Sequence, residues 1–456
     1  MKLKKYRLAD IGKVITGKTP STSIAENYAC GNIPFYTPED VAKGLRMMGR
    51  NNRFISQTGF EEIASNTISG ESVLVGCIGS DMGNVSYSNI TCATNQQINS
   101  ITQFKNGAEP LYVYYLLSTM KPYFQKIAGS TTTPILPKSV FEEIEIYLPG
   151  IKYQKDIVSI LYALDRKIAL NHQINDNLEA IAKQLYDYWF VQFDFPNEEG
   201  KPYKSSGGAM VWNEKLKREI PQGLGTPKIG DIEKNIITGK TPSCADEDNF
   251  GGDIPFVTID DIRGNLFVFE AQRTLSTKGA DSQEKKYLPI GSLSVSCIGT
   301  IGVMGFVARL AQTNQQINSI VFEHEYNKEF LYFSLKLYYE NAKAKTGNVF
   351  ANMSKEEFAS IIVAYPPKQI LQAFHNKVAP IFDSIKNNIE EINSLTKQRD
   401  ELLPLLMNSQ AMVNYHLSVL FITKIMLYYK ETNINFRYER NNNTKRFRWN
   451  ESGSVS

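Results

Sequence analysis

The spacing of apolar residues switches along the chain between short strand-like runs and long helical stretches. Short runs rich in β-branched residues and closed by glycine, such as Ser72–Gly79 and Ser292–Gly299, predict β-strands. Each strand-rich block continues into a helical patch and closes on an apolar strand that ends in proline. The helical patches are Leu111–Met120 and Phe330–Lys343, and the closing strands are Ile144–Pro149 and Ile361–Pro367. The pattern therefore predicts an α+β protein with two mixed α/β globules.

After each block the apolar residues fall three or four positions apart, which predicts a long amphipathic helix. The predicted helix-pairing residues are Leu161, Leu164, Ile168, Asn171, Leu178 and Leu185 in the first helix and Val378, Ile381, Ile385, Asn388, Leu395 and Leu402 in the second. A sustained 3.5-residue seam is typical of a coiled coil, and a polar residue in it can fix the register. The alternative is an isolated amphipathic helix on each globule. Pairing is favoured because Asn171 and Asn388 occupy the same position in the two seams.

Proline interrupts only the second helical pattern, at Pro380 and Pro404. A proline inside a helix removes a hydrogen bond and collides with the preceding turn. We therefore expect the second helix to break or begin near Pro380.

Near-identical segments recur in the two halves of the chain. Thr94–Ile101, with the sequence TNQQINSI, returns unchanged as Thr313–Ile320, and Ile15–Ser21 (ITGKTPS) returns as Ile237–Ser243. A repeat of this length indicates two copies of a domain, since solenoid units run to only about 20–50 residues. The predicted organisation is a first globule at 1–150, a helix at 151–193, a linker at 194–225, a second globule at 226–367, a second helix at 368–410 and a tail at 411–456. The linker lacks periodicity, and the polar, basic end of the tail is expected to be disordered beyond about Asn433.

The composition argues against several classes of site and segment but does not identify a function. A net charge of +3 permits a nucleic-acid partner without requiring one. The 5 cysteines form no C-x-x-C pair and the 4 histidines are scattered, which argues against a zinc site. Cys77 and Cys297 are equivalent residues in strand-like runs and are expected to be buried. The charged amino terminus lacks a signal region, and the longest apolar run of the tail, Leu417–Tyr429, is too short to span a bilayer. We expect a reduced, cytoplasmic protein with no metal or cofactor of its own.

One motif imitates a nucleotide-binding loop. Gly12–Thr19 fits G-x-x-x-x-G-K-[ST], but Pro20 follows it at once, and the second copy has Lys234 where the first glycine would stand. Nucleotide binding at this loop is therefore rejected. The chain also lacks [DN]-P-P-[YF], G-x-S-x-G and H-E-x-x-H, so no catalytic residue is predicted.

The repeated loops are suited to recognition instead. The lysine and hydroxyls of TGKTPS can contact phosphate oxygens, and the amides of TNQQINS could bond to adenine or tie neighbouring loops together. Identity in both copies favours the structural role for the amides, because readers of different sequences should differ. The divergent stretches Val41–Ser65 and Ile262–Lys286 are better candidates for base readout. The candidate DNA-binding residues are Thr16, Gly17, Lys18, Thr19, Ser21, Arg46, Arg50, Arg53, Lys138, Thr238, Gly239, Lys240, Thr241, Ser243, Arg263, Arg273 and Lys278.

From residue 1 to about 417 the chain resembles the DNA-specificity subunits of type I restriction–modification systems. The resemblance rests on the order of its elements: the TGKTPS and TNQQ segments, the helix from Leu164–Ile168 through Tyr188–Phe190, and the connector segments Gln192–Pro196 and Gly200–Gly208. The tail beyond about Leu417 departs from the family pattern, which ends shortly after Leu402–Met407.

This resemblance implies a non-catalytic subunit with two target-recognition domains, each reading one half of a bipartite DNA sequence. The helices would pair antiparallel, set the length of the unread spacer and dock two methyltransferase subunits. Those subunits would bind S-adenosylmethionine and methylate adenine, while two restriction subunits would use ATP and Mg²⁺. The alternative is a protein-interaction scaffold that has lost DNA reading.

Overall fold

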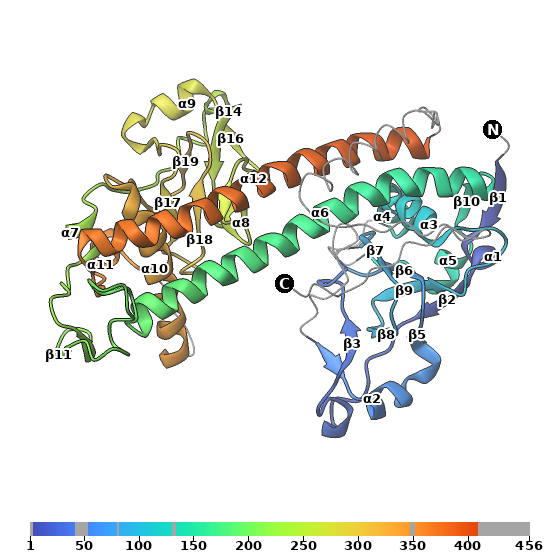
Figure 1. Cartoon of the computed structure of the whole chain (residues 1–456). Coiled ribbons are helices and arrows are strands. Elements are labelled where there is room, and N and C mark those ends of the chain that lie inside the picture. The colour runs from blue at the N-terminus through green and yellow to red at the C-terminus, as the bar shows by residue number, and fades with distance from the viewer. Residues whose placement is uncertain (1–2, 42–52, 80–81, 130–133, 347–351, 409–456) are drawn as a thin grey trace. The chain divides into compact units, whose positions relative to one another are not determined.

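The computed structural model describes residues 3–41, 53–79, 82–129, 134–346 and 352–408. The chain divides into two compact units, Met1–Arg166 with Thr396–Ser456 and Lys167–Leu395 (Figure 1). Each unit holds one globule and part of each of the two long helices. The tail, including Leu417–Tyr429 and Asn433, lies outside the described residues.

The first unit is built on two small sheets. One has the order β2-β9-β6-β7 and is antiparallel throughout; the other has the order β4-β3-β8-β5, with β3 and β8 parallel. A separate pair, β1 (Lys4–Arg7) with β10 (Glu145–Leu148), closes the globule. The other strands are β2 (Lys13–Thr16), β3 (Ile33–Tyr36), β4 (Phe54–Ile55), β5 (Thr67–Ile68), β6 (Ser72–Gly76), β7 (Val85–Ser88), β8 (Cys92–Thr94) and β9 (Ile98–Thr102). The helices are α1 (Leu8–Ile11), η1 (Ala25–Asn27), α2 (Gln57–Glu62), η2 (Ala64–Asn66), α3 (Pro110–Ser118), α4 (Lys121–Ile127) and α5 (Lys138–Glu142).

The central strand β6 shows why its sequence is apolar throughout. Successive strand residues point to opposite faces. Val73 and Val75 accordingly join the core under α3, and Leu74 joins a second cluster with Ile15 and Ile98. Both faces of β6 are covered, so the whole run is buried.

The second unit repeats this plan. Its larger sheet has the order β13-β20-β17-β18-β15, whose first four strands match β2-β9-β6-β7, and its smaller sheet has the order β16-β14-β19. The strands are β13 (Ile236–Thr238), β14 (Phe250–Val257), β15 (Phe267–Val268), β16 (Thr274–Leu275), β17 (Leu293–Ser296), β18 (Met304–Val307), β19 (Gln312–Thr313) and β20 (Ile317–Ile320). The helices are α7 (Ile229–Ile232), η4 (Glu247–Asn249), α8 (Ile259–Ile262), α9 (Thr277–Asp281), η5 (Glu284–Lys286), η6 (Glu325–Asn327), α10 (Lys328–Thr346) and α11 (Lys355–Ala359).

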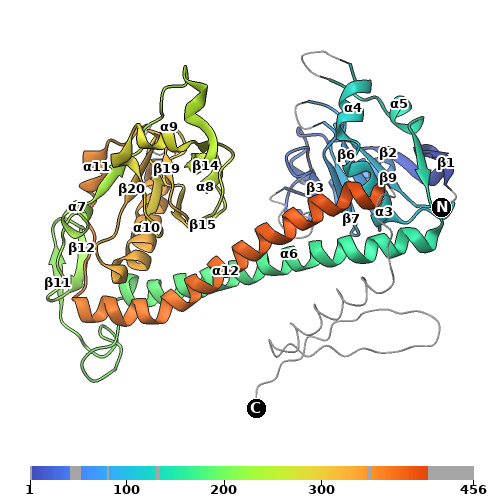
Figure 2. The same cartoon turned by 90° about the horizontal axis from the view of Figure 1, so that it is seen from above.

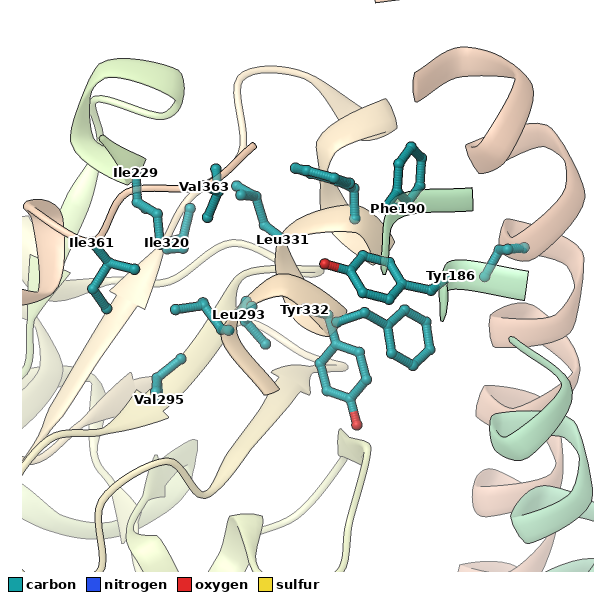
Figure 3. Close-up of a cluster of buried hydrophobic side chains, with 14 of the residues drawn as sticks. Tyr186, Phe190, Ile229, Leu293, Val295, Ile320, Leu331, Tyr332, Ile361 and Val363 are labelled. Atoms are coloured by element: carbon teal, nitrogen blue, oxygen red, sulfur yellow. The ribbon is translucent and has the colours of Figure 1, made fainter. Parts of the chain in front are cut away.

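The core of the second unit lies between its large sheet and its helices (Figure 3). Leu293 and Val295 of β17 point toward Leu331 of α10, and Tyr186 and Phe190 reach the same cluster from the end of the first long helix. This helix therefore ends inside the core of the second globule.

The long helices are α6 (Ile151–Tyr186), continued by a π-helical turn η3 (Asp187–Val191), and α12 (Lys368–Met407). Figure 2 shows the end of α12 beside the first part of α6. In the first unit, Ile157 and Leu161 of α6 share the hydrophobic core with Leu406 near the end of α12. In the second unit, Asn171 of α6 bonds to Glu391 of α12, and Asn175 bonds to Asn388. Partner numbers fall on α12 as they rise on α6, so the helices pair antiparallel. The predicted fold class is confirmed.

The expected break at Pro380 is wrong, because α12 runs through both Pro380 and Pro404. Both prolines are exposed, as are Asn376 and Asp400, the residues four positions earlier whose carbonyls lose their partners. Water can bond to those carbonyls. The buried seam residues on the opposite face hold the helix together against a cost of about 3 kcal/mol per proline.

The connector after α6 is more ordered than its lack of periodicity predicted. It holds a hairpin of β11 (Met210–Asn213) and β12 (Arg218–Pro221). Asp194 accepts hydrogen bonds from the backbone N and the Oγ of Ser205, at 2.7 and 2.6 Å. Conversely, the strand predicted at Ile361–Pro367 is reduced to isolated bridges opposite Gly225 and Lys228. Pro227 lies between those partners and has no N–H to continue the ladder.

Among the described helices, none is long and apolar enough to cross a membrane.

Candidate nucleic-acid interface

The strand order of each large sheet brings the repeated segments together. In the first unit β2 and β6 both run antiparallel to β9, so their carboxyl ends flank the beginning of β9. The TGKTPS segment begins at Thr16, the last residue of β2; Cys77–Gly79 follows β6, and Thr94–Gln97 precedes β9. We call this edge the motif end of the sheet. The second unit has the same motif end, formed at β13, β17 and β20.

Inside the motif end, buried asparagines tie the segments to one another. Thr16 Oγ1 donates to Asn99 Oδ1 at 2.7 Å, and the equivalent Thr238 donates to Asn318 at 2.6 Å. Asn99 Nδ2 donates in turn to the sulfur of Cys77 at 3.2 Å. Both asparagines are 2% exposed, so they hold the loops and cannot touch DNA.

The equivalent cysteines lie beneath these loops, and their predicted burial is confirmed at 3% exposure for Cys77 and 2% for Cys297. Burial raises the pKa of the Cys77 thiol to about 12 and that of Cys297 to about 11. Both remain protonated and unreactive near neutral pH.

At the surface of the motif end, the threonines of TGKTPS bond to glutamines of TNQQ. Thr19 Oγ1 donates to Gln96 Oε1 at 2.9 Å, and Thr241 donates to Gln315 at 2.8 Å. The hydroxyl protons of Thr16, Thr19, Thr238 and Thr241 are thus used within the protein. These threonines orient the loop instead of donating to phosphate.

The glycines of the two TGKTPS loops are explained by close approach. A Cβ on Gly17 would lie 2.1 Å from Thr94 Oγ1, and one on Gly239 would lie 2.2 Å from the carbonyl oxygen of Asn314. Only glycine lets the loops pack against each other at this distance. The serines contribute backbone: the carbonyls of Ser21 and Ser243 each accept a 3.0 Å bond from an asparagine amide.

The rejected nucleotide-binding loop has the wrong structure for that role. Residues Lys13–Thr16 form β2 itself, so Gly12–Thr19 is not a loop between a strand and a helix. No helix begins at Lys18; the next helical turn in the chain is η1. Among the described residues, no group of three or more His, Cys, Asp or Glu side chains could hold a metal ion.

Most described cations of the candidate set already have partners. Carboxylates hold Arg53 (Glu39, 2.7 Å, and Asp40, 3.1 Å), Lys138 (Glu142, 3.5 Å), Arg263 (Asp260, 3.7 Å) and Lys278 (Asp246, 2.9 Å, and Asp248, 3.3 Å). Arg273 lies over the ring of Phe250, 4.4 Å from its centroid. Arg46 and Arg50 lie outside the described residues, as does residue range 42–52 of the divergent stretch.

Arg53 and Arg273 show how the copies diverge on a shared frame. Their carbonyls accept equivalent 3.0 Å bonds from Phe35 and Phe256. Their side chains nevertheless have different partners, carboxylates in one copy and an aromatic ring in the other. The backbone contact is therefore the same in both copies, whereas the side-chain contacts differ.

Lys18 and Lys240 stand apart from the paired cations. Both are exposed, and within the part of the chain that the structure describes no carboxylate lies within ion-pair distance of either. They are equivalent residues at the two motif ends.

Sequence patterns did not identify the residues whose side chains donate hydrogen bonds to the backbone of the TGKTPS loops. Asn66 Nδ2 donates to the carbonyl of Thr16 at 2.9 Å, and Lys286 Nζ donates to that of Thr238 at 2.9 Å. Asn27 and Asn249, which bind the two serine carbonyls, occupy equivalent positions and could have been found by aligning the copies. Asn66 and Lys286 differ in type, so alignment carried no signal for them.

The predicted helix-pairing residues are all buried or half-buried in α6 and α12. Asn171 and Asn388 do not bond to each other: Asn171 donates to Glu391 at 2.8 Å and Asn388 donates to Asn175 at 2.8 Å. Lys167 also pairs with Glu391. These polar contacts form a short network within the second unit.

Two repeated globules with paired helices and loop-built motif ends define a recognition protein. The family model for the type I restriction modification DNA specificity domain matches the chain twice, at residues 2–180 and 221–399. The chain therefore belongs to the type I restriction–modification DNA-specificity family. Members of this family are non-catalytic DNA-recognition subunits that assemble with methyltransferase and restriction subunits.

Two specificity subunits are similar to this chain in sequence, and one solved structure is similar to it in fold. The chain is 32% identical over 355 residues to the HindI specificity subunit of Haemophilus influenzae, covering 66% of this chain and 77% of that protein. It is 28% identical over 421 residues to the MjaIX specificity subunit of Methanocaldococcus jannaschii, covering 87% and 91%. The crystal structure of a type I S subunit from M. genitalium superposes with a TM-score of 0.52 at 16% identity, over 89% of this chain and 96% of that one. At that identity the likeness concerns the fold alone.

Proposed function

We propose that this chain reads a bipartite DNA sequence, with one half-site bound at the motif end of each globule. The observation that carries the proposal is the duplicated motif end, where the same loops hold equivalent lysines while the surrounding side chains differ. Two copies of one frame with different surfaces suit the reading of two different half-sites. Base contacts specify the sequence and phosphate contacts position the protein.

In this proposal the paired helices α6 and α12 set the unread distance between the half-sites and dock the methyltransferase subunits, two per complex, with two restriction subunits beyond them. The polar contacts of Asn171, Glu391 and Asn388 support a single register, because an offset pairing would leave these groups without partners. A fixed register makes the separation of the half-sites a property of the protein.

A globule exchange tests the modular reading. Residues 1–150 would be replaced by the corresponding globule of a relative, the complex assembled with its methyltransferase subunits, and the methylated sequences mapped. We expect one half-site to change and the other to remain. If both halves change, or if the wild-type complex binds no DNA specifically, the proposal fails and a protein-interaction scaffold becomes the better account.

A further inference from the structure

Gln96 and Gln315 share a geometry that narrows what they can recognise. Each is exposed, and each accepts a hydroxyl proton at Oε1, from Thr19 at 2.9 Å and from Thr241 at 2.8 Å. The threonine fixes the amide oxygen toward the protein, which leaves the two N–H donors of Nε2 for an external ligand. A glutamine that reads adenine must present its oxygen and its nitrogen together. In Gln96 and Gln315 the oxygen is held by the threonine, so the group turned to a ligand is the Nε2 amide.

The adjoining lysines present donors as well. Lys18 stands between Gly17, which packs against Thr94, and Thr19, which bonds to Gln96. The loop is thus anchored on both sides of an exposed ammonium group that, among the described residues, has no carboxylate within ion-pair distance. Lys240 repeats the arrangement, and its backbone N–H bonds to the carbonyl of Thr313 at 2.9 Å.

An exposed ammonium group beside amide N–H donors favours a ligand rich in acceptors. The non-bridging oxygens of a phosphodiester accept hydrogen bonds and carry negative charge; the major-groove edge of guanine also offers two acceptors, N7 and O6, but it carries no net charge. The arrangement is also identical in both globules, although their surroundings diverge. An identical element cannot discriminate two half-sites, but it can hold the sugar–phosphate backbone in the same way at both.

We propose that Lys18 with Gln96, and Lys240 with Gln315, form a duplicated phosphate clamp that grips the DNA backbone at each half-site without reading bases. This inference rests on the proposed function, which it deepens by separating gripping residues from reading residues. It assigns Gln96 and Gln315 a ligand-binding role in addition to their structural one.

Salt-dependent binding tests the clamp. The full chain, assembled with its methyltransferase subunits, would be titrated with a mixed-sequence duplex over a range of salt concentrations. The variants are Lys18→Gln, Lys240→Gln, Gln96→Glu and Gln315→Glu; the glutamates keep an acceptor for the threonine hydroxyl and replace the amide donors with charge. Matched controls are Lys13→Gln and Gln103→Glu, which change exposed residues at the start of β2 and directly after β9, away from the motif end.

Each lysine variant is expected to lower the slope of log K against log salt by about 0.9 and to weaken binding roughly fivefold. The glutamate variants are expected to weaken binding at least as much. The controls should match wild type, and the methylated sequence should remain the same in all variants. An unchanged slope in both lysine variants overturns the clamp, and so does a change in the sequence methylated by either glutamate variant. If the wild-type complex shows the expected slopes but methylates no bipartite site, the proposed function fails and the clamp stands.

Discussion

Arg399 of α12 donates a hydrogen bond from Nη1 to Oδ1 of Asp165 on α6 at 2.9 Å, inside the first unit. The second oxygen of Asp165 accepts from the hydroxyl of Tyr115 at 2.6 Å. The carboxylate side chain is only 4% exposed. Equivalent positions in the other copy are the apolar Ala182 and Phe382. At these equivalent positions the helix pair therefore has a buried ion pair in the first unit and apolar side chains in the second.

Removal of one partner of this buried pair should be costly. Arg399→Leu leaves a buried carboxylate with Tyr115 as its remaining partner, and we expect a loss of about 3 kcal/mol in the free energy of unfolding, measured by urea denaturation. The double variant Asp165→Leu with Arg399→Leu should recover most of that loss. Asp400→Asn is the control, because Asp400 also contacts Arg399 but is 59% exposed; its effect should stay below about 1 kcal/mol. Equal effects of Arg399→Leu and Asp400→Asn would contradict this account.

The pH dependence of stability should report the contact of His375 with Glu329. His375 Nδ1 lies 2.7 Å from Glu329 Oε2, and this hydrogen bond to a buried carboxylate raises the pKa of the imidazole. A raised folded-state pKa contributes stability that is fully present below about pH 6.5 and is lost as pH rises through the folded value. Thermal unfolding of the second unit should therefore move to lower temperature over that interval. His375→Gln should flatten the profile; an unchanged profile would show that this pair is not its source.

The glycines of the TGKTPS loops should not tolerate substitution even by alanine. Gly17→Ala places a Cβ 2.1 Å from Thr94 Oγ1 and 2.3 Å from the carbonyl of Asn95. We expect the loop to be displaced at a cost of about 1–3 kcal/mol, with weaker DNA binding measured on the assembled complex. Gly150→Ala, where no atom lies within 4 Å of the added carbon, is the control. Equal behaviour of the two variants would remove the packing explanation for Gly17.

The helix pair should act on the spacer of the target sequence. Removal of residues 168–174 from α6 together with residues 388–394 from α12 deletes one heptad from each helix. At 1.5 Å per residue this shortens the pair by about 10 Å, roughly three base pairs of DNA. We expect the unread spacer to shorten by up to that amount, or methylation to be lost, when methylated sites are mapped. If the variant methylates sites that have the original spacer length, the helices do not set that length.

Much of the fold could be predicted because local patterns and the repeat agreed. The apolar run around Val73 and Val75 predicted a buried strand, and the recurrence of Cys77 as Cys297 predicted burial of both thiols. Likewise, the seam through Leu161 and Leu164 predicted the helix. In each case the signal lies within a few residues or in the match between the two copies.

The remaining features depend on contacts that no local pattern contains. Thr19 and Gln96 are distant in sequence, and their hydrogen bond arises only because β2 and β9 are neighbours. Arg53 was predicted to contact DNA, but in the folded chain its guanidinium pairs with Glu39 and Asp40. The local sequence around Pro380 predicts a helix break. Pro380 is exposed, however, and the packing of the opposite face keeps α12 continuous.

In the proposed function, two globules joined by one helix pair read one bipartite site. Its most direct test is a map of adenine methylation in DNA modified by the wild-type chain assembled with its methyltransferase subunits. Methylation is expected at a single sequence made of two short specific halves separated by an unread spacer of constant length. Methylation at one continuous sequence, or at halves whose separation varies freely, would contradict it.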